Sequence, residues 1–200
     1  MTDKLSHKER TRARILDEAA RAIREHGSEG VGVAALMKRA GLTHGGFYAH
    51  FENRDDLVAH ALDRMRADSR EMLKRHLLER DPAEGLRALI DYYLSEKTRE
   101  RVDQGCPLPV LTQEARRLPP AARHQLEDGI RNFREQLERA LAHLGFAHAS
   151  TMASSVLAEM VGAMTLARAL ADEDEASDLL RSSRLELKRR LGLELSSSEN

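Results

Sequence analysis

Apolar residues recur every three or four positions along nearly the whole chain, and this pattern constrains its fold more than any other feature. Such spacing places side chains on one face of an α-helix, whereas a half-buried strand alternates apolar and polar residues. We see no convincing strand pattern and no internal repeat, so the sequence predicts an all-α fold. The clearest apolar run contains Leu126, Ile130, Phe133, Leu137, Leu141 and Leu144.

Glycine, proline and helix-capping residues divide the pattern into about nine helices. Asn53 followed by Asp56, and Asp81 followed by Pro82, are typical helix starts. We expect Gly27 to end the first helix in the left-handed conformation, and the acidic stretch DEDEAS to link the last two. The eighth helix is apolar nearly all round, which predicts burial on more than one side. The predicted ranges are about 6–26, 33–40, 43–51, 53–77, 82–94, 110–117, 120–144, 150–170 and 177–191.

Composition and charge narrow the class of protein. Of 200 residues, 41% are hydrophobic and 32% charged, as in a soluble globular protein. The single cysteine excludes an intramolecular disulfide, and no apolar run approaches the roughly 20 residues of a membrane span. The N-terminus is too charged for a signal peptide, so we expect a cytoplasmic protein with no membrane partner. Residues 1–54 carry 10 Lys and Arg against 7 Asp and Glu, which suggests a polyanionic partner at that end.

Two short predicted helices, 33–40 and 43–51, are joined by a turn that contains Gly41, as in a helix-turn-helix. Thr43 is the natural N-cap of the second helix. In such a unit the start of the second helix enters the major groove of DNA. Glycines there let the backbone approach DNA but read no bases, so we expect modest specificity per half-site. The residues placed against base edges are His44, Gly45 and Gly46.

Polar side chains around these positions are suited to the DNA backbone, because hydroxyl, imidazole and cationic groups donate to phosphate oxygens. Phe47 and Phe51, four residues apart, are expected to point back into the core. Basic residues at the start of the first helix, from Lys8 to Arg14, supply a salt-dependent attraction. The candidate phosphate contacts are Thr43, Tyr48, His50 and Arg54, with Lys38 and Arg39 on the preceding helix.

The stretch RILDEAARAIREHGSEGVGVAALMKRAGLTHGGFYAHFENRDDLVAHAL resembles the DNA-binding region of the TetR family of repressors. The match covers residues 10 to 62, and its densest part is AGLTHGGFYAHFENRDDL. Carried over by position, the resemblance implies the same base and phosphate contacts. Three positions depart from the family's usual residues: Ile23 stands for Phe, Gly32 for a Thr cap, and Arg54 for Lys. None of these changes alters the expected fold.

The resemblance implies an N-terminal three-helix helix-turn-helix domain followed by a helical ligand-binding and dimerisation domain. We place the first at residues 1–54, the second at 55–195, and a disordered tail at 196–200. The family's dimer forms through the last two helices, here 150–170 and 177–191, packed as a four-helix bundle. The dimer would set two recognition helices on a pseudo-palindromic operator in double-stranded DNA.

The family binds its inducer within the second domain, and several apolar and polar side chains are candidates to line that pocket. Methionine suits adaptable pockets, although apolar residues at helical spacing are more often plain core. The inducer itself is unknown. The candidate ligand-binding residues are Met72, His76, Tyr92, Tyr93, Cys106, Phe133, Met160 and Met164.

Cys106 has two interpretations that the sequence leaves open. It is either a small buried hydrophobic residue or a sensing thiol in the break between helices, beside Gly105 and Pro107. Some regulators of the resembled family with a similar GCPL-like junction respond to electrophiles. No Lys, Arg or His adjoins this cysteine in sequence to lower the pKa of its thiol.

No motif indicates an enzyme, a metal site or a cofactor. The nine histidines are scattered without metal-ligand spacing, and no nucleophile–base pair or phosphate loop is evident. The leading hypothesis is a ligand-responsive regulator, a dimeric repressor released from its operator by a small molecule or a thiol-reactive signal. The signal would act by moving the helix that begins at Asn53. The alternative is a small-molecule-binding helical bundle with no role on DNA. The sequence does not name the inducer, the operator or the target genes, nor does it separate repression from activation.

Overall fold

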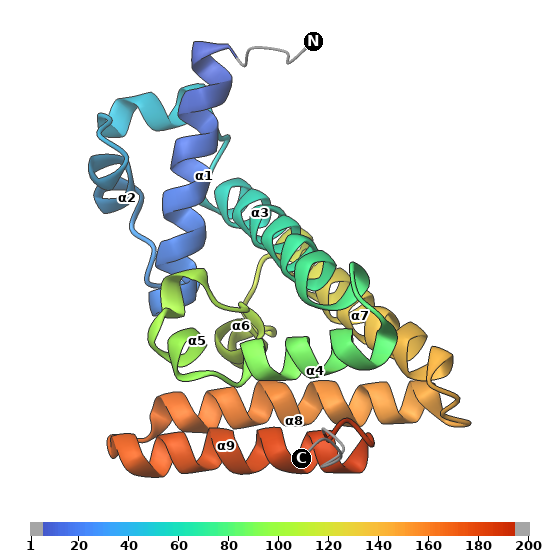
Figure 1. Cartoon of the computed structure of the whole chain (residues 1–200). Helices are drawn as coiled ribbons and strands as arrows, with labels where there is room; N and C mark the ends of the chain where they lie inside the picture. Colours follow the sequence, from blue (N-terminus) through green and yellow to red (C-terminus); the bar gives the residue numbers. More distant parts are fainter. Residues whose placement is uncertain (1–5, 195–200) are drawn as a thin grey trace. The chain divides into compact units, whose positions relative to one another are not determined.

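The computed structural model describes residues 6–194, and within that range it contains nine α-helices and no strand, which confirms the all-α prediction. Two 3-10 segments, η1 and η3, and one π segment, η2, complete the described part. The elements are α1 His7–His26, α2 Val33–Arg39, η1 His44–Ala49, α3 Arg54–Leu73, η2 Lys74–Leu78, α4 Pro82–Tyr93, α5 Glu96–Glu100, η3 Val102–Gln104, α6 Leu108–Glu114, α7 Pro120–His143, α8 Ala149–Ala169 and α9 Glu173–Arg190 (Figure 1).

Side-chain caps explain where several helices begin. The amide oxygen of Asn53 accepts a hydrogen bond from the backbone N–H of Asp56 at 2.9 Å, at the start of α3. The carboxylate of Asp81 accepts from the N–H of Ala83 at 3.1 Å, and Pro82 follows as the first residue of α4. These caps satisfy N–H groups that have no partner within the helix. Both predicted helix starts are confirmed.

Four local predictions differ from the structure. The third predicted helix is the 3-10 segment η1, and the short helix α5 was not predicted. The stretch DEDEAS is not a link: Asp172 caps Glu175 at 3.0 Å, so α9 already begins at Glu173. Its acidic residues therefore form the first helical turn, where the helix dipole favours them. Gly27 ends α1 at φ 76° and ψ 172°, a positive φ outside the left-handed helical region.

The chain forms two compact units. The first comprises Met1–Asp68 and Val102–Gly129, and the second comprises Ser69–Arg101 and Ile130–Asn200. Helices α3 and α7 each contribute residues to both units. The predicted functional division at residues 54 and 55 is a different partition, and it stays a prediction. The predicted disordered tail, 196–200, lies outside the described residues.

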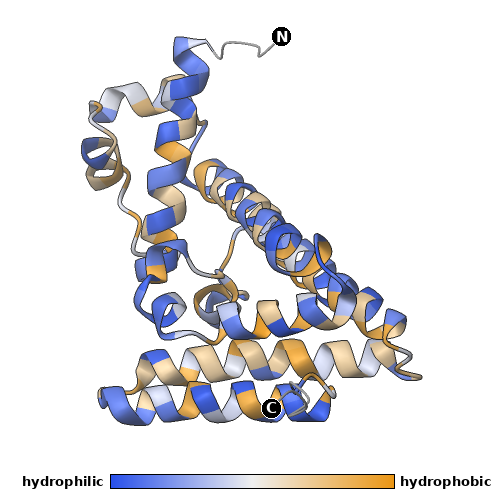
Figure 2. Ribbon diagram, viewed as in Figure 1, coloured by the Kyte–Doolittle hydropathy of each residue, from blue (hydrophilic) through white to orange (hydrophobic). Residues whose placement is uncertain are grey.

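In the first unit, α1, α2, η1 and the start of α3 enclose a small apolar core. In the second unit, α8 packs along α9, and α4 contacts both of them (Figure 1). Helix α8 is hydrophobic along most of its length, whereas polar and apolar residues alternate on α9 (Figure 2). The first core includes Ile15, Ala19, Ile23, Leu36, Met37, Phe47, Phe51 and Leu57, and the second includes Leu86, Leu89, Ile90, Val156, Met160, Met164, Leu180 and Leu187.

Candidate nucleic-acid interface

The turn between α2 and η1 is built around Gly41, which has φ +68°. A residue with a side chain is strained at such an angle, so glycine allows the chain to reverse here. The N–H of Leu42 donates to the carbonyl of Met37 at 2.8 Å and closes the end of α2. Thr43 occupies the N-cap position of η1 as predicted, but its hydroxyl makes no capping bond. That exposed hydroxyl therefore stays available to a partner such as a phosphate.

Aromatic packing fixes η1 against the core of the first unit. Phe47 and Phe51 are both buried, with ring centroids 5.6 Å apart, which confirms the predicted inward orientation. The ring of Tyr48 meets Phe47 edge to face at 5.3 Å and 85°. This contact holds one side of the Tyr48 ring against Phe47, while the residue remains 69% exposed. Thr43, His44 and Gly45 are exposed as well. The outer edge of η1 is thus polar and open.

His50 ends η1 beside the basic start of α1. Its side chain is half-buried, and within residues 6–194 its Nδ1 atom has no hydrogen-bond partner. Burial lowers the pKa of His50, and the positive charges of Lys8 and Arg12 lower it further. The guanidinium of Arg12 lies 4.8 Å from the centroid of the Phe51 ring, a cation–π contact that ties α1 to η1. This corner therefore brings the positive charges of Lys8 and Arg12 close to His50.

The three predicted cationic side chains differ in whether they already bind other groups of the protein. Lys38 is exposed, and within the described range it has no ion-pair partner. Arg39, in contrast, pairs with Glu18 at 3.2 Å and Glu25 at 3.5 Å. Arg54 donates to the backbone carbonyls of the turn after α1, so its guanidinium points to the protein. Lys38 is therefore the best placed of the three for a phosphate.

The predicted ligand-binding residues are divided between the two compact units. Cys106 is half-buried and belongs to the first unit, whereas the other seven belong to the second. His76 stacks on Tyr92 with ring centroids 4.1 Å apart, and both rings are partly exposed. Burial lowers the pKa of His76, and the charges of Arg75 and Arg80 lower it further. Met72 is half-buried. The four remaining candidates are buried in the core: Tyr93, Phe133, Met160 and Met164.

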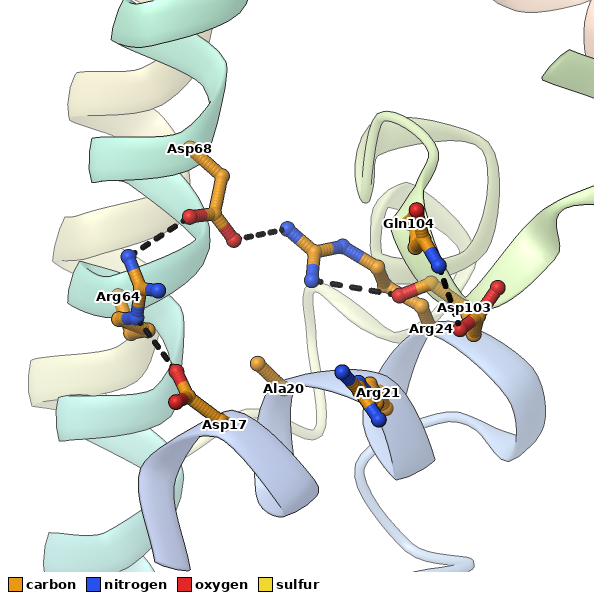
Figure 3. Close-up of a pocket in the computed structure, with 8 residues that line it drawn as sticks. All are labelled: Asp17, Ala20, Arg21, Arg24, Arg64, Asp68, Asp103 and Gln104. Atoms are coloured by element: carbon orange, nitrogen blue, oxygen red, sulfur yellow. Dashed lines mark hydrogen bonds and ion pairs between the residues drawn. The ribbon is translucent and has the colours of Figure 1, made fainter. Parts of the chain in front are cut away.

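A charged cleft of about 320 Å³ in the first unit was not predicted from the sequence. One of its lining residues is Arg24, which is only 4% exposed and pairs with Asp68 at 2.9 Å (Figure 3). Arg64 bridges Asp17 and Asp68 at 2.8 Å each, so the charges of the lining largely satisfy one another. Arg24 follows Ala20 by four residues on the flank of the apolar stripe of α1, which is the sequence signal for its burial. The lining residues are Asp17, Ala20, Arg21, Arg24, Arg64, Asp68, Asp103 and Gln104.

Residues 6–194 contain no cluster of three or more His, Cys, Asp or Glu side chains arranged to hold a metal ion. None of their helices combines the length and the hydrophobicity that a membrane span requires.

Solved structures with the same fold include proteins described as transcriptional regulators. The chain matches the reduced form of NemR from E. coli with a TM-score of 0.78 and 21% identity, covering 90% of this chain and 96% of that one. A TetR regulator from Chloroflexus aurantiacus J-10-FL matches with a TM-score of 0.81 and 24% identity, covering 92% and 96%. A TetR-family regulator from Agrobacterium tumefaciens matches with a TM-score of 0.81 and 23% identity, covering 92% and 98%. A search of curated proteins finds no significant match.

Family models match both parts of the sequence. Residues 15–61 match the model described as "Bacterial regulatory proteins, tetR family", which spans the latter part of α1, then α2, η1 and the start of α3. Residues 82–183 match the model described as "Tetracyclin repressor-like, C-terminal domain", and this match alone covers more than half of the chain. Because the helix-turn-helix geometry and both models agree, the chain belongs to the TetR family of helix-turn-helix, DNA-binding transcriptional regulators.

Proposed function

We propose that this regulator is a cytoplasmic, non-enzymatic homodimer that represses transcription by binding a pseudo-palindromic operator and leaves it when a signal binds. The observation that carries the proposal is the open polar edge of η1 beside the basic start of α1. Tyr48 stands out from this edge, and Lys8 and Arg12 act on His50 next to it. A surface that combines exposed hydrogen-bond donors with cations suits the DNA backbone.

The proposed contacts divide by role. We assign base edges to His44, Gly45 and Gly46, at the exposed start of η1. Phosphate contacts fall to Thr43, Tyr48, His50 and Lys38, whose donors lie on or beside the same edge. Arg54 and Arg39 stay proposed contacts, although each would exchange a bond within the protein for one to DNA.

A stripe of small and apolar residues supports dimerisation through α8 and α9. Serine, alanine and glycine at these positions would allow another helix to approach closely, as in a four-helix bundle. On α9, Leu185 is also exposed. Apolar side chains left in water on two neighbouring helices favour a partner, and a second copy would bury the same residues from both sides. The stripe on α8, exposed or half-buried, contains Ser155, Ala158, Gly162, Leu166 and Ala169.

Signal response would pass through α3. This helix begins directly after the η1 loop and contributes residues to both compact units, so a change in its tilt would move η1. The inducer would bind in the second unit, near Met72 or the His76–Tyr92 stack, which offers a partly exposed aromatic surface. A ligand lowers operator affinity only by its differential affinity for the two states. The half-buried thiol of Cys106 is the alternative point of entry for a signal.

Binding to the DNA upstream of the protein's own gene tests the proposal directly. Fluorescence anisotropy over a range of salt concentrations should show tight binding to one segment and weak binding to shuffled DNA of equal length. Tyr48→Phe with His50→Ala should weaken binding to both and flatten the salt dependence, because phosphate contacts are lost. A wild-type protein that does not distinguish the two DNAs would instead favour a ligand-binding helical bundle with no role on DNA.

The thiol needs its own test. Treatment with N-ethylmaleimide should release the wild-type protein from its operator if Cys106 is a sensor, and Cys106→Ser should abolish that release while preserving basal binding. Release that persists in the variant would make the cysteine a structural residue.

A further inference from the structure

The turn that follows α1 is held by side chains from two other elements of the first unit. The backbone N–H and the hydroxyl of Ser28 both donate to the same carboxylate oxygen of Glu114, at 2.7 Å each. The carbonyl of Ser28 accepts from the guanidinium of Arg54, whose Nε also donates to the carbonyl of Val31 at 3.4 Å. Ser28 is 4% exposed, so every polar group of this residue depends on these partners.

The turn is shaped around the Glu114 side chain. A Cβ atom on Gly27 would lie 1.9 Å from Oε1 of Glu114, so only glycine lets the carboxylate approach. Gly27 also has φ +76°, a second reason for glycine at this position. Hydrogen bonds to a charged acceptor are stronger than neutral ones, and a buried N–H that loses its partner is costly. The Glu114–Ser28 contact is therefore a strong link between sequence positions 86 residues apart.

The segment that carries Glu114 also holds α1 one turn earlier. Arg24 donates through Nη1 to the carbonyl of Asp103 in η3 at 3.4 Å, and through Nη2 to Asp68 (Figure 3). The exposed pair Arg117–Glu29, at 3.4 Å, adds little by itself. Residues 102–114 thus contact the C-terminal end of α1 and the following turn at two points. We call this segment the η3–α6 clamp.

The clamped turn leads directly into the helix-turn-helix. Helix α2 begins at Val33, η1 follows, and Arg54 returns from the first position of α3 to the same turn. The entry into α2 is therefore held at Ser28, where Glu114 accepts from the N–H and the hydroxyl and Arg54 donates to the carbonyl.

We propose that Glu114 is a positioning residue for DNA binding: it holds the α1–α2 turn, and so sets the orientation of η1, from the C-terminal end of α6. A displacement of α6 then reaches η1 through Ser28, separately from any change in the tilt of α3. Cys106 lies two residues before α6, so a signal at that junction has this short route to the turn. The part of the proposal that concerns DNA rests on the proposed function.

Three variants of the full-length protein test the role of Glu114. Glu114→Ala removes the acceptor, Glu114→Gln keeps a neutral oxygen that can accept both hydrogen bonds from Ser28, and Glu29→Gln removes a charge from the same turn without touching Ser28. Hydrogen–deuterium exchange measures the amides of residues 28–51, with α8 and α9 as an internal reference. Anisotropy measures binding to the operator and to shuffled DNA, and circular dichroism measures thermal unfolding.

Glu114→Ala should raise exchange across residues 28–51 and lower operator affinity about tenfold, within the usual range of coupling between sites. Binding to shuffled DNA and its salt slope should stay unchanged, because the phosphate-contacting side chains remain. Glu114→Gln should recover most of the affinity, and Glu29→Gln should match the wild type. A loss of thermal stability with operator affinity held within about twofold would show a purely structural role and overturn the proposal.

Two further outcomes are also decisive. If wild-type protein does not select an operator, the proposed function fails, and the role of Glu114 in holding the turn is then tested by hydrogen–deuterium exchange alone. Unchanged exchange across residues 28–51 in Glu114→Ala would overturn that role. If Glu114→Ala does not fold, Glu114→Gln and Ser28→Ala replace it. Ser28→Ala removes one of the two bonds, so it should lower operator affinity about threefold, near the low end of such couplings. Wild-type exchange and affinity in Ser28→Ala would overturn the proposal.

Discussion

At the residue scale, the proposed contact of His50 with a phosphate predicts that DNA binding is coupled to protonation. Burial and the charges of Lys8 and Arg12 lower its pKa, so the free protein favours the neutral form of the imidazole. A nearby phosphate would favour the charged form and raise that pKa. The DNA complex would then hold a proton that the free protein does not.

Operator affinity should therefore rise as the pH falls from about 7 toward the lowered pKa of the free protein, and level off below it. Anisotropy at constant ionic strength measures this effect. His50→Gln should flatten the part of the slope that His50 contributes, while His44→Gln, on the same element, serves as the matched control. An identical slope in wild type and His50→Gln would show that this imidazole does not meet a phosphate.

The same shift has a consequence for stability. Because the folded state holds the His50 proton less tightly than the unfolded state, the free energy of unfolding should fall as the pH drops below about 6.5. His50→Gln should lose this contribution. Thermal unfolding of both proteins between neutral and mildly acidic pH measures the difference.

A substitution at Gly27 tests the turn that is built around the carboxylate of Glu114. Gly27→Ala should lower the free energy of unfolding by about 2 kcal/mol or more, from backbone strain at φ +76° and from the clash with Glu114. Gly145→Ala is the control, because Gly145 has φ +85° but no atom within 4 Å of an added Cβ. It should show the backbone strain alone. Equal losses in chemical denaturation would mean that Glu114 moves aside freely.

At the scale of elements, η1 shows how composition decides the type of helix. It has only six residues, two of which are glycines, and glycine is a poor helix former. Its bonds from Gly46 to Thr43 and from His50 to Phe47 span three residues, as in a 3-10 helix. Helical periodicity predicted the position of this element well, because Phe47 and Phe51 keep the same inward face. It did not distinguish a 3-10 from an α-helix, since so short a segment carries little periodic signal.

Gly46→Leu distinguishes the effect of a side chain on the folding of η1 from its effect on DNA binding. An added Cβ would meet Thr43 and Met37 at 3.7 and 3.8 Å, which are ordinary contacts, so the protein should fold with unchanged or slightly higher stability. The larger side chain should crowd the DNA and lower operator affinity by about tenfold, or 1.4 kcal/mol. Gly129→Leu, at an open helical position in α7, is the control and should bind normally. Normal operator binding by Gly46→Leu would show that the start of η1 does not lie in the DNA interface.

At the scale of the whole molecule, the stripe on α8 predicts the oligomeric state. Leu166 is 58% exposed, and we expect it to be buried between two copies of the chain. Leu166→Glu should shift the protein to monomers, because a carboxylate in an apolar interface loses its hydration. Leu78→Glu is the control: Leu78 is 52% exposed in η2, away from α8 and α9 in sequence. Sedimentation at several concentrations measures both variants. A dimeric Leu166→Glu protein would place the interface elsewhere.

The sequence by itself determined the all-α fold, most helix starts and the helix-turn-helix. These features depend on local physics: apolar spacing, caps such as Asn53 and Asp81, and the turn glycine Gly41. It placed α9 four residues late, because a run of acidic residues was interpreted as a link although it forms the first turn beside the helix dipole.

Only the tertiary structure decided which polar side chains are free to meet DNA and which already serve the protein. Arg54 and Tyr48 are equally plausible contacts in the sequence, yet Arg54 binds the turn after α1 while Tyr48 stands exposed. The link between Ser28 and Glu114 was likewise invisible, since it joins residues 86 apart. Periodicity reports which face of a helix is buried, but hydrogen bonds between distant segments depend on how those segments pack, and no local pattern records that.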